Sequence, residues 1–358
     1  MTSMRILVLV VVLGLTACGS AGASATRSSP SASASNATSP SAPSPVTAAI
    51  NCSTTTSGAL TVLARNLVYD VSDPVHPRLV CRGSNTQIQL AGRTSIAYVT
   101  AKNGKALVMR RELATGAETL AGNLPFDPRN GFATWTPDGQ LEAYAADQNI
   151  HLWSGGADHV LYGIPPFFGG FESRWSSPRG IAAFSPNDTY LAFVDPVDFS
   201  SQNLRIFSIG DRRQLLAVGI GYALGGRWLP GDRFVWAGNS VMQWSPSGGA
   251  HSMRSERWFD PAASADGNWL AATVVSSSSV PHVLVVTFDG SKSFSTQLGS
   301  SPSFVSATVL WYAEEKACGS TCAADPTMPD GVVRAFDVLS GKDALVQFAA
   351  GEQPVASG

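Results

Sequence analysis

Apolar residues are concentrated in short runs along this chain, and a turn-forming motif precedes several of these runs. The motif is clearest in Trp135-Thr-Pro-Asp-Gly-Gln-Leu141, which leads into a short apolar run. Further copies begin at Phe184, at Trp228 and, without the leading aromatic residue, at Ala263. Proline fixes φ where a turn begins, and Gly, Asn or Asp supplies the positive φ that a tight hairpin needs. Each copy therefore predicts a hairpin, and a recurrence about every 40 residues is typical of a repeat architecture.

Each predicted unit continues as two strands with different patterns. The second strand is strongly apolar, and these strands begin at Leu60, Ile96, Leu141, Leu191, Phe234, Leu270 and Val309. The third strand alternates apolar and polar positions, and these strands begin at Leu67, Leu107, Ile150, Leu204, Val241, Val283 and Val332. A Gly-rich turn and a short fourth strand follow most of them.

This pattern predicts an all-β fold. Seven four-stranded antiparallel units over residues 51–358 predict a seven-bladed β-propeller. Six blades are the alternative, because the first unit has no opening turn of the kind seen in the others.

The turn motif, the apolar run and the alternating strand together resemble the TolB-type and WD-repeat-like propeller family. The likeness covers residues 51–358 and is most specific at 135–153 and 184–209. Asp70-Val-Ser-Asp-Pro-Val-His-Pro-Arg78 is also similar to propeller-forming repeats of surface proteins. The turn after Trp228 inverts the motif, and residues 301–308 lack it. The resemblance implies an interaction scaffold and does not imply a chemistry.

The first 17 residues are predicted to be an export signal. Arg5 supplies the positive start, and the apolar run Ile6–Leu15 is too short to span a bilayer. The sequence Leu15-Thr-Ala-Cys18-Gly resembles a bacterial lipobox, which implies cleavage before Cys18 and a diacylglyceryl group on its sulfur. The alternative is an ordinary secretory signal cleaved after Ala17. The lipobox predicts a chain anchored by lipid to the cell membrane on its extracytoplasmic side.

Residues 18–50 are predicted to be a disordered linker that begins with the lipidated cysteine. From position 19 to 50 the composition is dominated by Ser, Ala, Thr, Pro and Gly, and Arg27 is the only charged residue. Such a segment cannot bury enough apolar surface to offset its ordering entropy. The propeller domain is therefore expected to cover residues 51–358.

Four cysteines lie beyond Cys18, which in an exported chain predicts disulfide bonds. Three pairings are possible, and Cys52–Cys81 with Cys318–Cys322 is favoured because each pair falls within one predicted blade. The first pair closes a loop of about 30 residues, which stabilises the fold by roughly 3–4 kcal/mol in the chain-entropy model. Zinc binding by all four is the weaker alternative, because no two-residue Cys spacing occurs.

Antiparallel strands place the second-to-third loops and the links between blades at one end of a propeller. Nearly every insertion in this chain falls in that set, so this end is the predicted binding face. The residues predicted to lie on it are aromatic: Phe167, Phe168, Phe171, Trp175, Phe199 and Trp258. In the alternative interpretation, the rings of segment 165–175 fold back and cap a blade junction.

The sequence contains no recognisable catalytic arrangement, cofactor motif or metal site. The turn carboxylates Asp138, Asp188, Asp232 and Asp266 are assigned to structure, and the five histidines show no metal-ligand spacing. The formal net charge of −2 without a basic stripe argues against nucleic acid.

We therefore expect a monomeric, non-catalytic binding or scaffold protein. Its expected partner is a protein, a peptide or a cell-wall glycan, and its only membrane contact is the lipid. Two alternatives are an accessory subunit of a cell-envelope complex and a lactonase-, lyase- or glycosidase-like propeller enzyme. The residues considered for an enzyme site at the channel mouth are Glu172, Asp195, Asp198 and His282.

Overall fold

The computed structural model describes residues 49–53, 58–129, 133–164, 182–196, 202–221, 225–238, 240–275, 280–317, 327–350 and 352. Every helix or strand assigned in these ranges is a β-strand, and all strand pairs are antiparallel. The predicted export signal, Cys18 and nearly all of the predicted linker lie outside the described residues. Within the described ranges, no helix has the length and apolar character needed to cross a membrane.

The first three sheets have four strands each. The first contains β1 (Ala49–Cys52), β2 (Leu60–Leu63), β3 (Leu67–Asp70) and β4 (Arg78–Ser84), in the spatial order β1-β4-β3-β2. The second contains β5 (Ile88–Leu90), β6 (Ser95–Lys102), β7 (Lys105–Glu112) and β8 (Glu118–Leu124). The third contains β9 (Ala133–Trp135), β10 (Leu141–Ala146), β11 (Asn149–Ser154) and β12 (Ala157–Gly163).

Two further four-stranded sheets precede a longer one. The fourth contains β13 (Ala182–Phe184), β14 (Tyr190–Pro196), β15 (Gln202–Ser208) and β16 (Arg213–Gly221). The fifth contains β17 (Gly226–Leu229), β18 (Arg233–Ala237), β19 (Val241–Ser245) and β20 (Gly249–Arg254). The sixth has seven strands: β21 (Trp258–Ala263), β22 (Trp269–Val275), β23 (Pro281–Thr287), β24 (Ser293–Phe304), β25 (Val309–Ala317), β26 (Thr327–Asp337) and β27 (Lys342–Leu345).

Strand β24 joins two four-stranded sets within the sixth sheet. Its residues 293–298 pair with β23, and its residues 299–304 pair with β25. The predicted all-β architecture of successive four-stranded antiparallel units is therefore confirmed for the described residues.

Hydroxyl groups at the start of the predicted turns explain why the hairpins form. Thr136 donates its amide to the Leu141 carbonyl (3.0 Å), and its Oγ1 accepts the Leu141 amide (3.1 Å). Ser264 accepts the Trp269 amide in the same way (3.0 Å). These hydroxyls are buried, so each one satisfies a strand amide that water does not reach. Gly139 supplies the positive φ of the first turn (67°), as the motif predicts.

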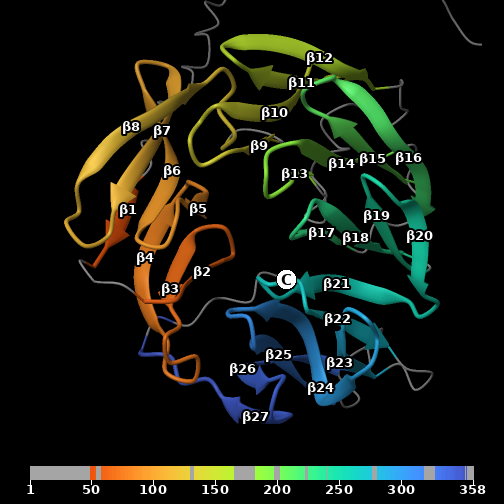
Figure 1. The fold of residues 1–358 in the computed structure, drawn as a ribbon. Helices are drawn as coiled ribbons and strands as arrows, with labels where there is room; N and C mark the ends of the chain where they lie inside the picture. Colours follow the sequence, from red (N-terminus) through yellow and green to blue (C-terminus); the bar gives the residue numbers. More distant parts are fainter. Residues whose placement is uncertain are drawn as a thin grey trace, which may run out of the picture. The chain divides into compact units, whose positions relative to one another are not determined.

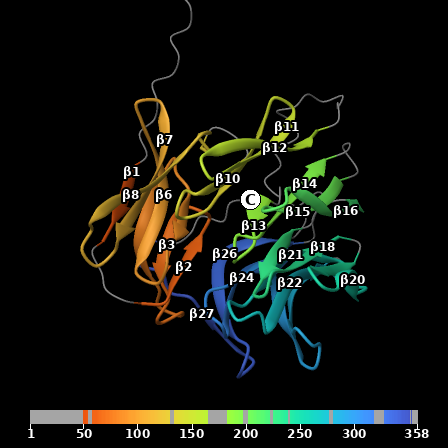
Figure 2. The ribbon, with the colours of Figure 1, turned by 45° about the horizontal axis from the view of Figure 1, so that its top comes forward.

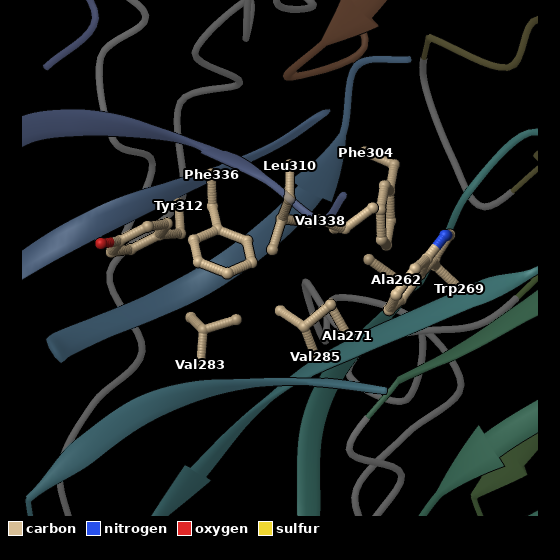
Figure 3. Close-up of a cluster of buried hydrophobic side chains, with 10 residues drawn as sticks. All are labelled: Ala262, Trp269, Ala271, Val283, Val285, Phe304, Leu310, Tyr312, Phe336 and Val338. Atoms are coloured by element: carbon tan, nitrogen blue, oxygen red, sulfur yellow. The ribbon is translucent and has the colours of Figure 1, made fainter. Parts of the chain in front are cut away.

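Buried apolar clusters join each sheet to the next in chain order. Each cluster contains residues of both neighbours, for example Val80 with Ile96, Val108 with Trp135, Ile150 with Phe193, Leu204 with Trp236, and Val235 with Leu270. Inside the sixth sheet, Val283 and Val285 of β23 face Leu310 and Phe336 (Figure 3). The innermost strands also make contacts between sheets: β2 contacts β5, β9 contacts β13, and β17 contacts both β13 and β21. These strands lie nearest the middle of Figure 1.

The last sheet packs against the first and completes the circuit. Trp311 of β25 lies in one apolar cluster with Leu67 and Tyr69 of β3. Its indole nitrogen donates to the carbonyl of Pro74 (3.0 Å), so the contact is both apolar and polar. No described strand is shared between these two sheets. We call this contact the seam, and Figures 1 and 2 show the last strands (blue) next to the first sheet (orange) around the ring.

A segment after the last strand reinforces the seam. This C-terminal strap, residues 346–350 together with Glu352, leaves β27 and crosses to the first sheet. The Gln347 amide donates to the Val75 carbonyl (2.7 Å). Phe348 packs edge-on against both Tyr69 (5.8 Å between centroids) and Trp311 (5.5 Å). The ring is therefore closed by side chains and by the strap.

The first sheet differs from its prediction. Residues 60–63 were expected to form a second strand, but β2 lies at the sheet edge and β3 takes the second position. The strand at the opposite edge is β1, which precedes β2 in the chain. It begins at Ala49, two residues before the predicted domain boundary. Ile50 packs against the cluster of the first two sheets, which explains why the segment joins the fold.

The predicted Cys52–Cys81 disulfide is present and links β1 to β4. Cys81 is fully buried, and the two cysteines are direct partners in the strand register. The second predicted pair, Cys318–Cys322, lies outside the described residues.

The second and third sheets approach each other closely through two glycines. A β-carbon at Gly122 of β8 would lie 2.8 Å from the Gly139 carbonyl oxygen and 2.9 Å from that of Asp138. Both atoms belong to the hydrogen-bonded backbone of a turn, so they cannot move independently. Gly122 is thus required by the contact between the sheets.

We predict that Gly122→Ala destabilises the protein by about 1–3 kcal/mol, because the added methyl overpacks this contact. Gly210→Ala is the matched control, because a β-carbon there meets nothing within 4 Å. Urea unfolding of both variants measures the difference. Equal midpoints would show that the two sheets do not approach in this way.

We also predict that Phe348→Ala destabilises the chain by about 2–3 kcal/mol, because it removes a half-buried ring that packs on two others. Leu339→Ala, at a side chain that is 71% exposed, is the control and should change the unfolding free energy little. A Phe348→Ala variant as stable as the control would contradict the closure described here.

Candidate functional site

Most residues predicted for the binding face lie outside the described ranges. These are Phe167, Phe168, Phe171, Trp175 and Phe199. The exception is Trp258, and there the prediction is corrected: its side chain is fully buried in the cluster between the fifth and sixth sheets. Trp258 opens strand β21 opposite Val274, so its ring faces apolar neighbours and not solvent.

The residues considered for an enzyme site do not gather in the described structure. Glu172 and Asp198 lie outside it. Asp195 belongs to β14 of the fourth sheet, whereas His282 belongs to β23 of the sixth. The two residues therefore sit on different sheets, and the structure gives no support for a shared site.

Asp195 instead belongs to a group of polar contacts that links the third and fourth sheets. Its carboxylate, 1% exposed, accepts hydrogen bonds from the Tyr162 hydroxyl (2.8 Å) and from Arg205 Nε (3.2 Å). The Arg205 guanidinium also lies over the Tyr162 ring, 4.0 Å from its centroid. A buried carboxylate held by a cation and a hydroxyl is a structural ion pair, and removing Arg205 would leave an uncompensated buried charge on Asp195.

Two of the four turn carboxylates, Asp138 and Asp266, hold their own turns, as the sequence predicted. Asp138 accepts the Thr136 hydroxyl (2.6 Å) and the Gln140 amide (3.0 Å). Asp266 holds the turn at Ser264 in the same way. Burial and the charges of Asp138 and Asp232 raise the pKa of Asp188, so neighbouring turns lie close together. Among the described residues, no three His, Cys, Asp or Glu side chains are grouped so that they could hold a metal ion.

A polar cluster on one face of the third sheet is the most unusual feature of the described chain. Phe126, Tyr144 and His151 form a stack of three rings, with centroids 5.2 Å and 5.0 Å apart. His151 Nδ1 lies 2.9 Å from the carboxylate of Asp158 on β12. Burial raises the pKa of the Tyr144 phenol, and its hydrogen bond to the Asp158 carboxylate adds a smaller effect in the same direction.

Glu142 lies on the same face of β10 and is fully buried. Its Oε2 accepts the Phe126 amide (3.3 Å), while its Oε1 has no partner among the described residues. The pKa of this carboxyl is raised to about 8, chiefly by burial and also by the charges of Asp127 and Asp158, against the lowering effect of the Phe126 amide. Glu142 is therefore mostly protonated near neutral pH.

Sequence reasoning missed this cluster, although a signal was present. A glutamate interrupts the otherwise apolar run that begins at Leu141, and it pairs directly with Trp135 and Trp153 on the adjacent strands. Two further buried polar atoms on this face, Trp135 Nε1 and His151 Nε2, also lack partners among the described residues. The cluster can hold and release a proton, but the full burial of Glu142 keeps its carboxyl away from any substrate.

A groove between the fifth and sixth sheets is the other candidate. It has a volume of about 360 Å³ and an apolar floor that includes Val241, Leu270 and Val286. Charged side chains form part of its rim, and Arg254 pairs with Glu256 there (3.2 Å). Because these two opposite charges pair with each other, they favour neither an anionic nor a cationic ligand.

The connections between strands are unequal at the two ends of the sheets. The first-to-second and third-to-fourth turns are short wherever both flanking strands are described. The longest connections are 125–132, 164–181 and 318–326, and all three belong to the second-to-third loops and links between sheets. Strand alternation places this set at one end, as the sequence predicted.

Comparisons with known proteins find similar solved structures only. No protein-family model matches the chain, and no curated protein matches it. Among solved structures, the chain is similar to TolB from Acinetobacter baumannii (TM-score 0.40, 14% identity, 79% of this chain and 77% of that chain). It is also similar to an oligogalacturonate lyase in complex with manganese (TM-score 0.43, 11% identity, 70% and 73%).

A prolyl endopeptidase gives a third similarity (TM-score 0.47, 13% identity), which covers 84% of this chain. This chain spans about half of the length of that structure, 49%. All three TM-scores are 0.47 or lower and all three identities are 14% or lower, so these similarities assign no function to the chain.

The buried Glu142 carboxyl should make the stability of the folded protein depend on pH. In the unfolded chain its carboxyl ionises near its ordinary pKa of 4.5, whereas in the folded chain it stays protonated up to about pH 8. The folded state binds more protons in this window, so stability falls as the pH rises from about 4.5 to about 8. Glu142→Gln should remove this loss and gain up to about 2–3 kcal/mol relative to wild type between pH 5.5 and pH 7.5.

Urea unfolding of wild type and Glu142→Gln across this pH range measures the effect. Glu256→Gln, at a side chain that is 44% exposed, is the control for losing a carboxylate elsewhere. Parallel pH profiles for wild type and Glu142→Gln would show that the Glu142 pKa is not raised in the folded protein.

Proposed function

We propose that this chain is a lipid-anchored, extracytoplasmic, seven-bladed propeller that acts as a monomeric, non-catalytic binding protein. The two four-stranded sets joined by β24 count as separate blades, which makes seven with the first five sheets. The lipobox at Cys18 and the low-complexity segment after it support a tether that holds this domain outside the membrane. The partner is a protein, a peptide or a cell-wall glycan.

The observation that carries this proposal is the unequal length of the connections. Short turns with buried hydroxyls fix one end, whereas the longest segments, 125–132, 164–181 and 318–326, all belong to the other. Loops on a rigid scaffold are where recognition residues concentrate. Segment 164–181 also contains Phe167, Phe168, Phe171 and Trp175, and aromatic residues are enriched at binding hot spots.

The polar clusters described above also support a binding role. Asp195 is committed to Tyr162 and Arg205, and Glu142 is enclosed between sheets. The Asp195 contacts link two sheets of the scaffold, and the burial of Glu142 keeps its carboxyl from a ligand, which leaves the loop-rich end for recognition.

Capture of partners from crosslinked cells tests the proposal. Full-length wild type is compared with a variant in which the four aromatic residues at 167, 168, 171 and 175 are replaced by Ser. We expect wild type to retain a specific protein or glycan and the variant to lose at least about nine-tenths of it, because hot-spot aromatics dominate binding.

Leu339→Ser is the matched control, because it replaces an exposed apolar residue in a turn at the opposite end. It should retain the partner, and both variants should unfold like wild type. Equal capture by all three chains would contradict the assignment of this face.

A further inference from the structure

Both ends of the described chain are fastened to strand β4 of the first sheet. At the N-terminal end, β1 pairs only with β4, from Ala49 opposite Ser84 to Cys52 opposite Cys81. One further backbone bond, from the Ser53 amide to the Val80 carbonyl (2.9 Å), follows the disulfide. The disulfide thus closes the inner end of a four-residue ladder.

At the C-terminal end, the strap reaches the same strand. The Leu79 amide of β4 donates to a carboxylate oxygen of Glu352 (3.3 Å). The hydroxyl of Tyr69, the direct partner of Leu79 on β3, donates to the Glu352 carbonyl. Leu79 lies only two positions from Cys81, so the disulfide and the strap act on neighbouring residues of one strand.

Strand β1 has four residues and pairs with β4 alone, which is distant from it in sequence. Other four-residue edge strands, such as β2 and β27, also have one partner each, but a short turn joins each of them to that partner, whereas β1 has the disulfide as its covalent link. Edge strands as short as this are held weakly by hydrogen bonds alone. If β1 leaves, β4 becomes the edge of the sheet, and its amides are then open to exchange with water.

We infer that the Cys52–Cys81 disulfide is a redox-sensitive clamp on ring closure. A dithiol reductant transfers two electrons and two protons to the disulfide, which becomes two thiols while the dithiol becomes a disulfide. Strand β1 is then released, β4 loses its outer partner, and the Leu79–Glu352 contact that holds the strap is loosened. Reduction of the disulfide at the outer edge of the first sheet thereby weakens the contacts between the first and last sheets at the seam.

Hydrogen exchange measured by mass spectrometry on the full-length chain tests this inference. Oxidised wild type is compared with wild type treated with dithiothreitol and with Cys52→Ala. We expect amide exchange in β1, β4 and residues 346–350 to be about tenfold or more faster after reduction or substitution, because these elements lose protection together. Strands β14 and β15 of the fourth sheet should be unchanged.

The variant Cys318→Ala/Cys322→Ala is the matched control, since dithiothreitol would also reduce the predicted Cys318–Cys322 disulfide. Without reductant it should exchange like oxidised wild type, and with reductant it should respond like wild type. Faster exchange in β1 with an unchanged strap would overturn the inference, because the disulfide would then act only locally. A strap response that disappears in the control variant would also overturn it. If Cys52→Ala exchanges fast throughout, the reversible reduction and reoxidation of wild type decides the outcome.

Discussion

The packing of Tyr69, Trp311 and Phe348 between the first and last sheets is the contact on which the rest of the architecture depends. Each sheet buries one face against the preceding sheet and the other against the following one. Every apolar face is covered in this arrangement only because the last sheet also packs against the first. Burying apolar area at the seam offsets the entropy of bringing residues from the two ends of the domain together.

The way in which the seam closes has structural consequences. No described strand crosses from the last sheet to the first, so backbone ladders do not hold the two together. Instead, an indole hydrogen bond to Pro74, a ring cluster and the strap carry the contact. Closure thus depends on a few side chains and on a segment that follows the last strand. Substitutions at these few positions should therefore affect the stability of the whole ring.

The regular part of the fold could be predicted from sequence because it is encoded locally. A hydroxyl, a carboxylate and a glycine at fixed spacing build each turn, as at Thr136, Asp138 and Gly139. The strands that follow are recognised by their apolar runs for the same reason. The first sheet was predicted less well, because the position of β1 is set by a disulfide and by packing of the partly buried Ile50, both of which are contacts distant in sequence.

The candidate sites were harder to predict, for a physical reason. Whether an aromatic residue such as Trp258 faces solvent or core depends on the neighbouring sheet, and composition does not report that. The raised pKa of Glu142 likewise comes from burial between two sheets and not from its own strand. Loop length, in contrast, can be read directly from the spacing of the strands, and the proposed function relies on that feature.

The most direct test of this account is urea unfolding of a chain that ends after Leu345 and so lacks the strap. The account predicts a loss of several kcal/mol of stability relative to the full chain, because Val346 and Phe348 would no longer cover Tyr69 and Trp311. An unfolding midpoint equal to that of the full chain would contradict closure by the strap.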